Sequence, residues 1–176
     1  MFARRYTVLS LGFCILVGCN RQSDDMPAKN SHTTANSDPA VAKVQLTDFQ
    51  KTVQQNLENQ IGAGITYVDA YYSGGSPPAN AGVCTDVVAR SFKAAGVDLR
   101  ELVDQDMKKS PAAYGHQTTD KNIDYRRCKN LIIYFRRHGV SLPSANDPSS
   151  WQPGDIIFYD TGSRGYTDHV AVLSSH

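Results

Sequence analysis

Apolar residues recur every three or four positions in four stretches of this chain, which is the spacing of one helix face. In the first stretch, residues 47–61, the apolar positions lie four apart, and Thr47 with Gln50 has the form of a capping box. The other three predicted helices span residues 84–95, 98–109 and 124–137, and glycine or proline follows each of them. The pattern therefore predicts four helices before residue 140.

The pattern changes after residue 150. Two short apolar runs, residues 156–159 and 169–173, are bounded by turn residues and predict buried strands. The glycine-containing link between them suits an antiparallel hairpin. A weak alternation at residues 67–72 fits either a short strand or an extended arm. Helices first and strands afterwards predict an α+β fold, with N-terminal helices packed on a small antiparallel sheet.

The N-terminus has the order of a bacterial export signal. Arg4 and Arg5 precede an apolar run, residues 8–17, that is too short to span a bilayer comfortably. The run ends in Leu-Val-Gly-Cys, which resembles a lipobox and predicts a signal peptide over 1–18 with lipid attached to Cys19. The alternative is that Cys19 belongs to an ordinary or uncleaved signal. Lipidation would anchor the protein to a membrane of the cell envelope, facing the periplasm or the exterior.

Residues 19–44 are rich in small polar residues and contain no aromatic residue, so we expect a disordered tether. The remaining residues, 45–176, form the predicted domain.

The chain carries 18 basic and 17 acidic residues without a strong block of either sign, which gives no indication of a nucleic-acid partner. Histidines and cysteines lack the short spacings of metal ligands, and no glycine-rich phosphate loop is present, so we expect no metal and no cofactor.

Candidate chemistry lies at Cys84, which opens the second predicted helix. A cysteine becomes nucleophilic when its thiolate is stabilised by the positive end of a helix dipole and a nearby imidazolium. His169, at the start of a predicted strand, is the best candidate for that imidazole, because a Cys/His pair needs proximity in space rather than in sequence. Asp86, in the first helical turn, caps the helix or orients groups near Cys84.

Five blocks of sequence, in order, carry a family resemblance: residues 82–88 (Gly-Val-Cys-Thr-Asp-Val-Val), 122–127, 137–139, 151–157 and 169–172. Together they closely resemble the DUF1287 family, which is related to the NlpC/P60 cysteine peptidases, over residues 65–174. The resemblance implies a papain-like fold of the NlpC/P60 type, with Cys84 as nucleophile and His169 as base. It also implies hydrolysis of an amide bond, with stem peptides of peptidoglycan as the natural substrate and another amide or a thioester as the alternative.

The resemblance further implies a third polar residue, on the next strand, that orients the imidazole. The chain stops seven residues after His169, so we expect the domain to be incomplete at its C-terminus, and His176 is a weak substitute for this group.

A second hypothesis for the function is a catalytically inactive envelope-binding lipoprotein, because a thiol and an imidazole without the orienting residue would be badly positioned. A third is a structural lipoprotein in which Cys84 and Cys128 form a disulfide. Against the disulfide, Cys128 is typical of a small core residue. Arg126 and Arg127 indicate a solvated face, or less readily a site for an acidic substrate.

Overall fold

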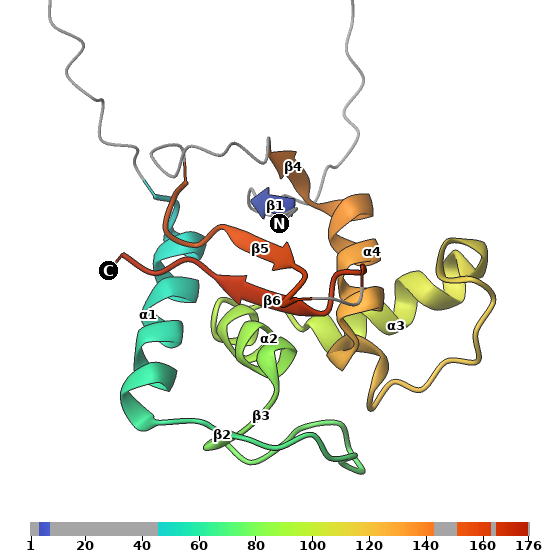
Figure 1. Ribbon diagram of the computed structural model, residues 1–176, viewed down its shortest axis with the longest axis horizontal. Helices are drawn as coiled ribbons and strands as arrows, with labels where there is room; N and C mark the ends of the chain where they lie inside the picture. Colours follow the sequence, from blue (N-terminus) through green and yellow to red (C-terminus); the bar gives the residue numbers. More distant parts are fainter. Residues whose placement is uncertain (1–3, 8–45, 143–150, 163–164, 176) are drawn as a thin grey trace, which may run out of the picture. The chain divides into compact units, whose positions relative to one another are not determined.

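The computed structural model describes residues 4–7, 46–142, 151–162 and 165–175, and these form one unit with mixed helix and sheet (Figure 1). The α+β class predicted from the sequence is confirmed. The predicted lipid site Cys19, the tether and His176 lie outside the described residues, as does most of the predicted signal peptide. The helices are α1 (Asp48–Ala63), α2 (Cys84–Ala94), α3 (Leu99–Lys109) and α4 (Cys128–His138), with 3-10 turns at Pro111–Tyr114 (η1) and Asp124–Arg126 (η2).

The helix boundaries follow the capping signals closely. α1 begins after Thr47, whose side chain accepts a hydrogen bond from the Gln50 backbone while the Gln50 side chain accepts one from the Thr47 backbone. α3 begins after Asp98, whose carboxylate accepts the Glu101 N–H. Because such caps satisfy backbone donors that have no partner within the helix, they fix where each helix starts.

The fourth predicted helix begins later than expected. Residues 124–126 form a 3-10 turn, and Arg127 has extended backbone angles, so α4 starts only at Cys128. The carboxylate of Asp124 is committed to other partners, accepting from the Asp120 N–H and from Arg127. The predicted start at residue 124 was therefore wrong, because helical periodicity does not reveal a short 3-10 turn preceding an α-helix.

Two sheets accompany the helices. The larger is antiparallel, with strand order β4-β1-β5-β6, where the strands are β1 (Arg4–Thr7), β4 (Val140–Leu142), β5 (Ile156–Tyr159) and β6 (His169–Val172). β5 and β6 form the predicted antiparallel hairpin. The smaller sheet pairs β2 (Thr66–Tyr67) with β3 (Ala81–Gly82) in parallel, so the weak pattern at 67–72 contributes only one strand residue. β1 lies inside the segment predicted to be a signal peptide.

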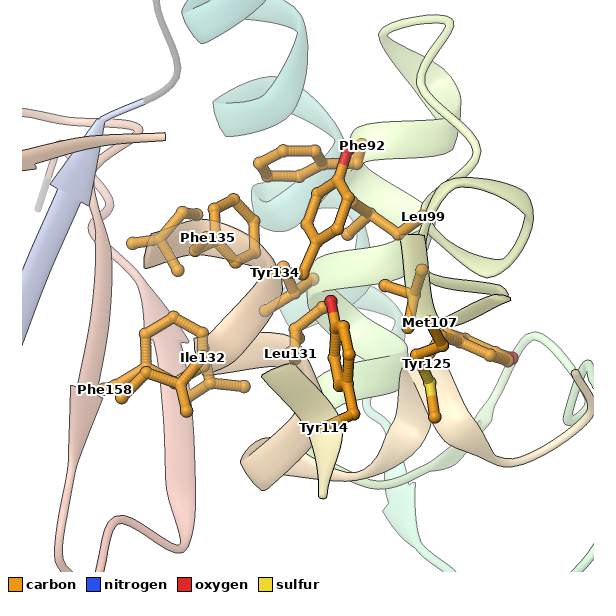
Figure 2. Close-up of a cluster of buried hydrophobic side chains, with 14 of the residues drawn as sticks. Phe92, Leu99, Met107, Tyr114, Tyr125, Leu131, Ile132, Tyr134, Phe135 and Phe158 are labelled. Atoms are coloured by element: carbon orange, nitrogen blue, oxygen red, sulfur yellow. The ribbon is translucent and has the colours of Figure 1, made fainter. Parts of the chain in front are cut away.

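The core lies between α2, α4 and the β5–β6 hairpin. Phe92 of α2 meets Phe135 of α4 edge to face, with ring centroids 5.5 Å apart, and Phe135 packs against Phe158 of β5 at 5.7 Å (Figure 2). All three side chains are almost completely buried. Aromatic rings of this size bury much apolar area, so this cluster fixes the position of α2 relative to the sheet. The start of α2 is thereby held beside β6.

Candidate active site

Cys84 is the first residue of α2, where unpaired backbone N–H groups and the helix dipole create a positive environment. The preceding residue, Val83, has extended backbone angles and caps the helix without a side-chain hydrogen bond of its own. Its backbone N–H donates instead to the Asp86 carboxylate at 2.8 Å. The local sequence therefore presents the Cys84 thiol at a fixed helix N-terminus.

His169 is the first residue of β6, directly opposite Tyr159 of β5. The two rings are in contact, with centroids 5.0 Å apart. Since α2 packs against β6, the imidazole is brought to the same region as the Cys84 thiol. Among the described residues, no polar side chain forms a hydrogen bond with the His169 imidazole.

Cys84 and His169 line one cleft of about 310 Å³. The rest of its wall is largely apolar and comes from α1, the β2–β3 sheet, α2 and β6: Leu57, Ile65, Tyr67, Gly82, Val83, Val87, Val88, Val170, Ala171 and Val172. No carboxylate, lysine or arginine of the described residues lines it. A concave, mostly apolar site with a few convergent polar groups is typical of small-ligand and active sites.

A second thiol lies beside the first. The Sγ atoms of Cys84 and Cys128 are 3.9 Å apart, within hydrogen-bonding distance for sulfur, and both cysteines are free and half-buried. A hydrogen bond from Cys128 is the largest cause that lowers the pKa of Cys84. Burial opposes it, but the Val170 backbone, the charge of His169 and the Thr85 backbone add to it, and the pKa of Cys84 falls to about 6. The same contact and burial raise the pKa of Cys128.

The sequence indicated this proximity only through the alternative of a Cys84–Cys128 disulfide, whereas both cysteines are free in the structure. Cys128 does pack against the hydrophobic core, as predicted, but it also opens α4 and points its thiol at Cys84 across 44 residues of sequence. From the sequence, Cys84 opens one predicted helix, but Cys128 lies four residues inside another, which is predicted to begin at residue 124. The pattern therefore did not predict that both thiols lie at helix starts, or that these two starts are neighbours.

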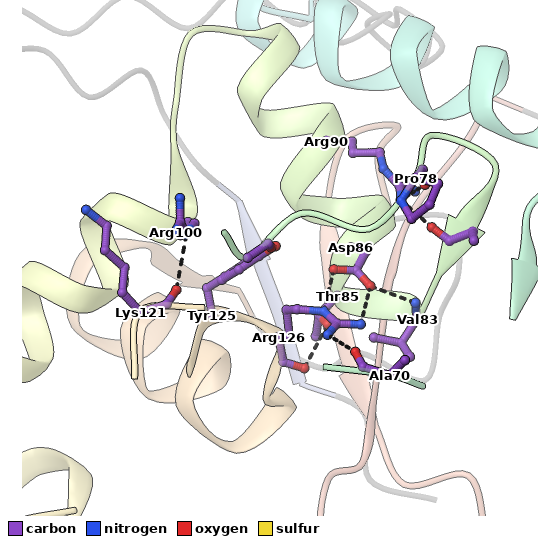
Figure 3. A network of polar contacts seen from close by, with 12 residues as sticks. Ala70, Pro78, Val83, Thr85, Asp86, Arg90, Arg100, Lys121, Tyr125 and Arg126 are labelled. Atoms are coloured by element: carbon purple, nitrogen blue, oxygen red, sulfur yellow. Dashed lines mark hydrogen bonds and ion pairs between the residues drawn. The ribbon is translucent and has the colours of Figure 1, made fainter. Parts of the chain in front are cut away.

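A buried ion pair joins Asp86, in the first turn of α2, to Arg126 of η2 (Figure 3). Arg126 Nε and Nη2 donate to the two oxygens of Asp86 at 2.8 and 3.0 Å, and Nη1 donates to the Ala70 carbonyl at 2.6 Å. The predicted solvated face is therefore wrong for Arg126, which is 7% exposed. Burying a guanidinium is unfavourable unless it is paired, and Asp86 provides the partner. Asp86 thus caps α2, as expected, and also ties its start to η2.

The remaining candidates have local roles. Asp155 accepts a hydrogen bond from the Gln152 backbone at 3.0 Å and so stabilises the turn before β5. His138, in the last turn of α4, pairs with Asp106 at 3.0 Å. In the described part of the chain, no group of histidine, cysteine and acidic side chains has the arrangement of a metal site. Likewise, no helix there is long and apolar enough to cross a membrane.

The family follows from comparison with known sequences. Residues 48–176 match the model of DUF1287, described as a domain of unknown function, and the chain belongs to this family. A similar protein is "Uncharacterized protein YijF" of Escherichia coli (strain K12), which is 36% identical over 146 residues. That alignment covers 77% of this chain and 69% of the relative. No solved structure matches the chain.

Proposed function

We propose that this chain is a cell-envelope lipoprotein whose domain hydrolyses an amide bond through the Cys84 thiolate and the His169 imidazole. The observation that carries the proposal is the meeting of these two side chains in one apolar cleft, with the cysteine at a helix N-terminus. A cysteine at a helix start facing a histidine on a neighbouring strand is also the arrangement expected of a papain-like, NlpC/P60-type fold. The acidity of Cys84 supports the role of nucleophile, because the thiolate is the reactive form.

The reaction proceeds in two steps. The Cys84 thiolate attacks the carbonyl carbon, and the His169 imidazolium donates its proton to the leaving nitrogen as the C–N bond breaks, which leaves a thioester. Water then attacks the thioester, imidazole takes one of its protons, the C–S bond breaks to restore the Cys84 thiolate, and the carboxylic acid leaves and loses its own proton to solvent. The backbone N–H of Cys84, at the helix start, stabilises the negative charge on the carbonyl oxygen in both steps.

The cleft restricts the substrate. Its described wall carries no charged side chain apart from the reacting pair, so the group bound next to the scissile bond is uncharged and small enough for about 310 Å³. Alanine residues of peptidoglycan stem peptides meet this condition. Location in the envelope would bring them within reach of a domain tethered through Cys19.

Alkylation tests the nucleophile without a known substrate. Iodoacetamide should modify Cys84 in preference to Cys128 at pH 6, because a thiol with a pKa of about 6 is about half thiolate there, whereas the pKa of Cys128 is raised and its thiol stays protonated. His169→Ala should slow the Cys84 reaction, whereas His138→Ala, on the far end of α4, should leave it unchanged. Equal modification of both cysteines at every pH would refute the assignment. Incubation with purified muropeptides, with Cys84→Ala as the inactive control, then tests the substrate.

A second candidate is an envelope-binding lipoprotein without turnover. It is favoured by the His169 imidazole, for which the described residues supply a ring contact with Tyr159 but no hydrogen-bonded orienting group. Catalysis depends on holding the base in line, so a loosely held imidazole gives a reactive thiol with poor turnover. Muropeptides that bind but remain intact, together with a reactive Cys84, would favour this candidate.

The anchor is tested separately. Cys19→Ala should move the protein from the membrane fraction to the soluble fraction, because the lipid would no longer be attached. An unmodified N-terminus in mass spectrometry, with unchanged membrane partition of the variant, would refute the lipoprotein proposal. That outcome would leave the proposal for Cys84 and His169 intact.

A further inference from the structure

The first residues of two helices, α2 and α4, lie side by side in this fold. Cys84 is the first residue of α2 and Cys128 is the first residue of α4, and their sulfur atoms are 3.9 Å apart. Each thiol therefore lies at the positive end of a helix, where a thiolate is favoured. Two thiolates at this distance would repel each other, so only one of the two sulfurs can ionise readily while the other keeps its proton.

The surroundings decide which sulfur ionises. The charge of His169 and the backbone N–H groups of Val170 and Thr85 all lower the pKa of Cys84. Cys128 instead experiences the carboxylate of Asp168. Burial and the electrostatic effects of Cys84, Asp168 and Cys128 raise the pKa of Tyr159 on β5, so this side chain stays neutral. A positive neighbour favours a thiolate and a negative neighbour disfavours one, so the negative charge resides on Cys84 and the proton on Cys128.

We propose that Cys128 is a positioning residue for the nucleophile: its S–H donates a hydrogen bond to the Cys84 thiolate and holds it as the reactive anion within the cleft. This inference rests on the proposed function of Cys84. Cys128 contributes no electrons and forms no bond with the substrate. Its proton stays on its own sulfur throughout, and its effect is exerted only through Cys84.

Two substitutions separate hydrogen bonding from packing. Cys128→Val replaces the thiol with an apolar side chain, whereas Cys128→Ser keeps an O–H donor at nearly the same place. The rate of Cys84 alkylation by iodoacetamide is measured from pH 5 to 9 in the reduced, full-length protein, and peptide mass spectrometry identifies the modified cysteine. Circular dichroism of each variant confirms that it is folded.

We expect the apparent pKa of Cys84 in Cys128→Val to rise by about one unit, a tenfold loss of thiolate at acidic pH, because the donor to the charged form is gone. Cys128→Ser should stay close to the wild type. A merely structural role would lower the stability of the variants without moving the pH profile. A Cys128→Val profile that overlays the wild type would overturn the inference, and so would equal shifts in both variants.

The same data distinguish this inference from the proposed function. If the wild-type Cys84 thiol has an ordinary pKa that His169→Ala does not change, then the nucleophile assignment fails and the role of Cys128 fails with it. If Cys84 is acidic and depends on His169, but Cys128→Val has no effect, only the role of Cys128 is wrong. A shift in Cys128→Val alone supports both.

Discussion

Replacing Asp86 with alanine removes the carboxylate that pairs with the buried Arg126 guanidinium. Asp86 accepts two hydrogen bonds from Arg126 and one from the Val83 backbone, and both charged side chains are almost fully buried. In Asp86→Ala, Arg126 would keep its bond to the Ala70 carbonyl, but two of its donor nitrogens would have no partner. The Val83 N–H would lose its partner as well.

The expected cost is large for one substitution. Removing one partner of a buried ion pair destabilises proteins by about 3–5 kcal/mol, because the remaining charge is left uncompensated. Domains have about 5–15 kcal/mol of stability in total, so the variant would lose a substantial part of it. For a domain of this size the melting temperature should fall by more than about 10 °C.

Urea unfolding followed by circular dichroism measures the effect. The double variant Asp86→Ala/Arg126→Met should be more stable than Asp86→Ala alone, since it no longer buries an unpaired charge. Lys51→Ala is the control: its ion pair with Asp48 at 3.0 Å is exposed, and its loss should cost less than about 1 kcal/mol. A loss below about 1 kcal/mol in Asp86→Ala, or a double variant less stable than the single one, would refute the reasoning.

Three further predictions concern other parts of the domain. Burial raises the pKa of Asp106, but hydrogen bonds from Arg137, Tyr114 and His138 outweigh burial and lower this pKa to about 2. The Asp106 carboxylate therefore stabilises the fold fully above about pH 4, and this stabilisation is lost as the pH falls from about 4 to 2. The urea midpoint of Asp106→Asn should therefore change less over that range than the midpoint of the wild type. Mild oxidation with diamide should join Cys84 to Cys128, because sulfurs 3.9 Å apart need only a small movement to reach the bonded distance of about 2.05 Å, and alkylation of Cys84 should then require a reductant. Gly82→Ala should lower the melting temperature, because φ is +145° there and a Cβ would lie 2.7 Å from an Asp86 oxygen; an unchanged melting temperature would contradict this.

Local signals were sufficient for the elements that carry the site. The capping box at Thr47 and the helix starts near residues 84 and 98 could be predicted because each depends on residues within one turn. The β5–β6 hairpin could be predicted because two apolar runs flank a short link. These elements bring Cys84 and His169 to one cleft, while the chemical roles of the two residues stay predictions.

Partners that are distant in sequence could not be predicted. The sequence around residue 126 favours a solvated face for Arg126. Its partner Asp86 lies 40 residues earlier, and no local pattern indicates that the two side chains form a buried ion pair. The contact between Cys84 and Cys128 depends in the same way on how α2 and α4 pack together. The late start of α4 affects both contacts. The 3-10 turn before α4 contains the buried Arg126, and the later start makes Cys128 the first residue of the helix.

Removal of a signal peptide would take one strand out of the larger sheet. Cleavage before Cys19 would remove β1, which pairs with β4 on one side and with β5 on the other. The mature chain would then leave the facing edges of β4 and β5 without this partner, and unpaired edges readily accept another strand. The site itself lies on the other side of β5. Its histidine is on β6, which pairs with the β5 edge away from β1, and its cysteine is on α2, which packs against β6. Loss of β1 should therefore lower the stability of the sheet more than it changes the reactivity of Cys84.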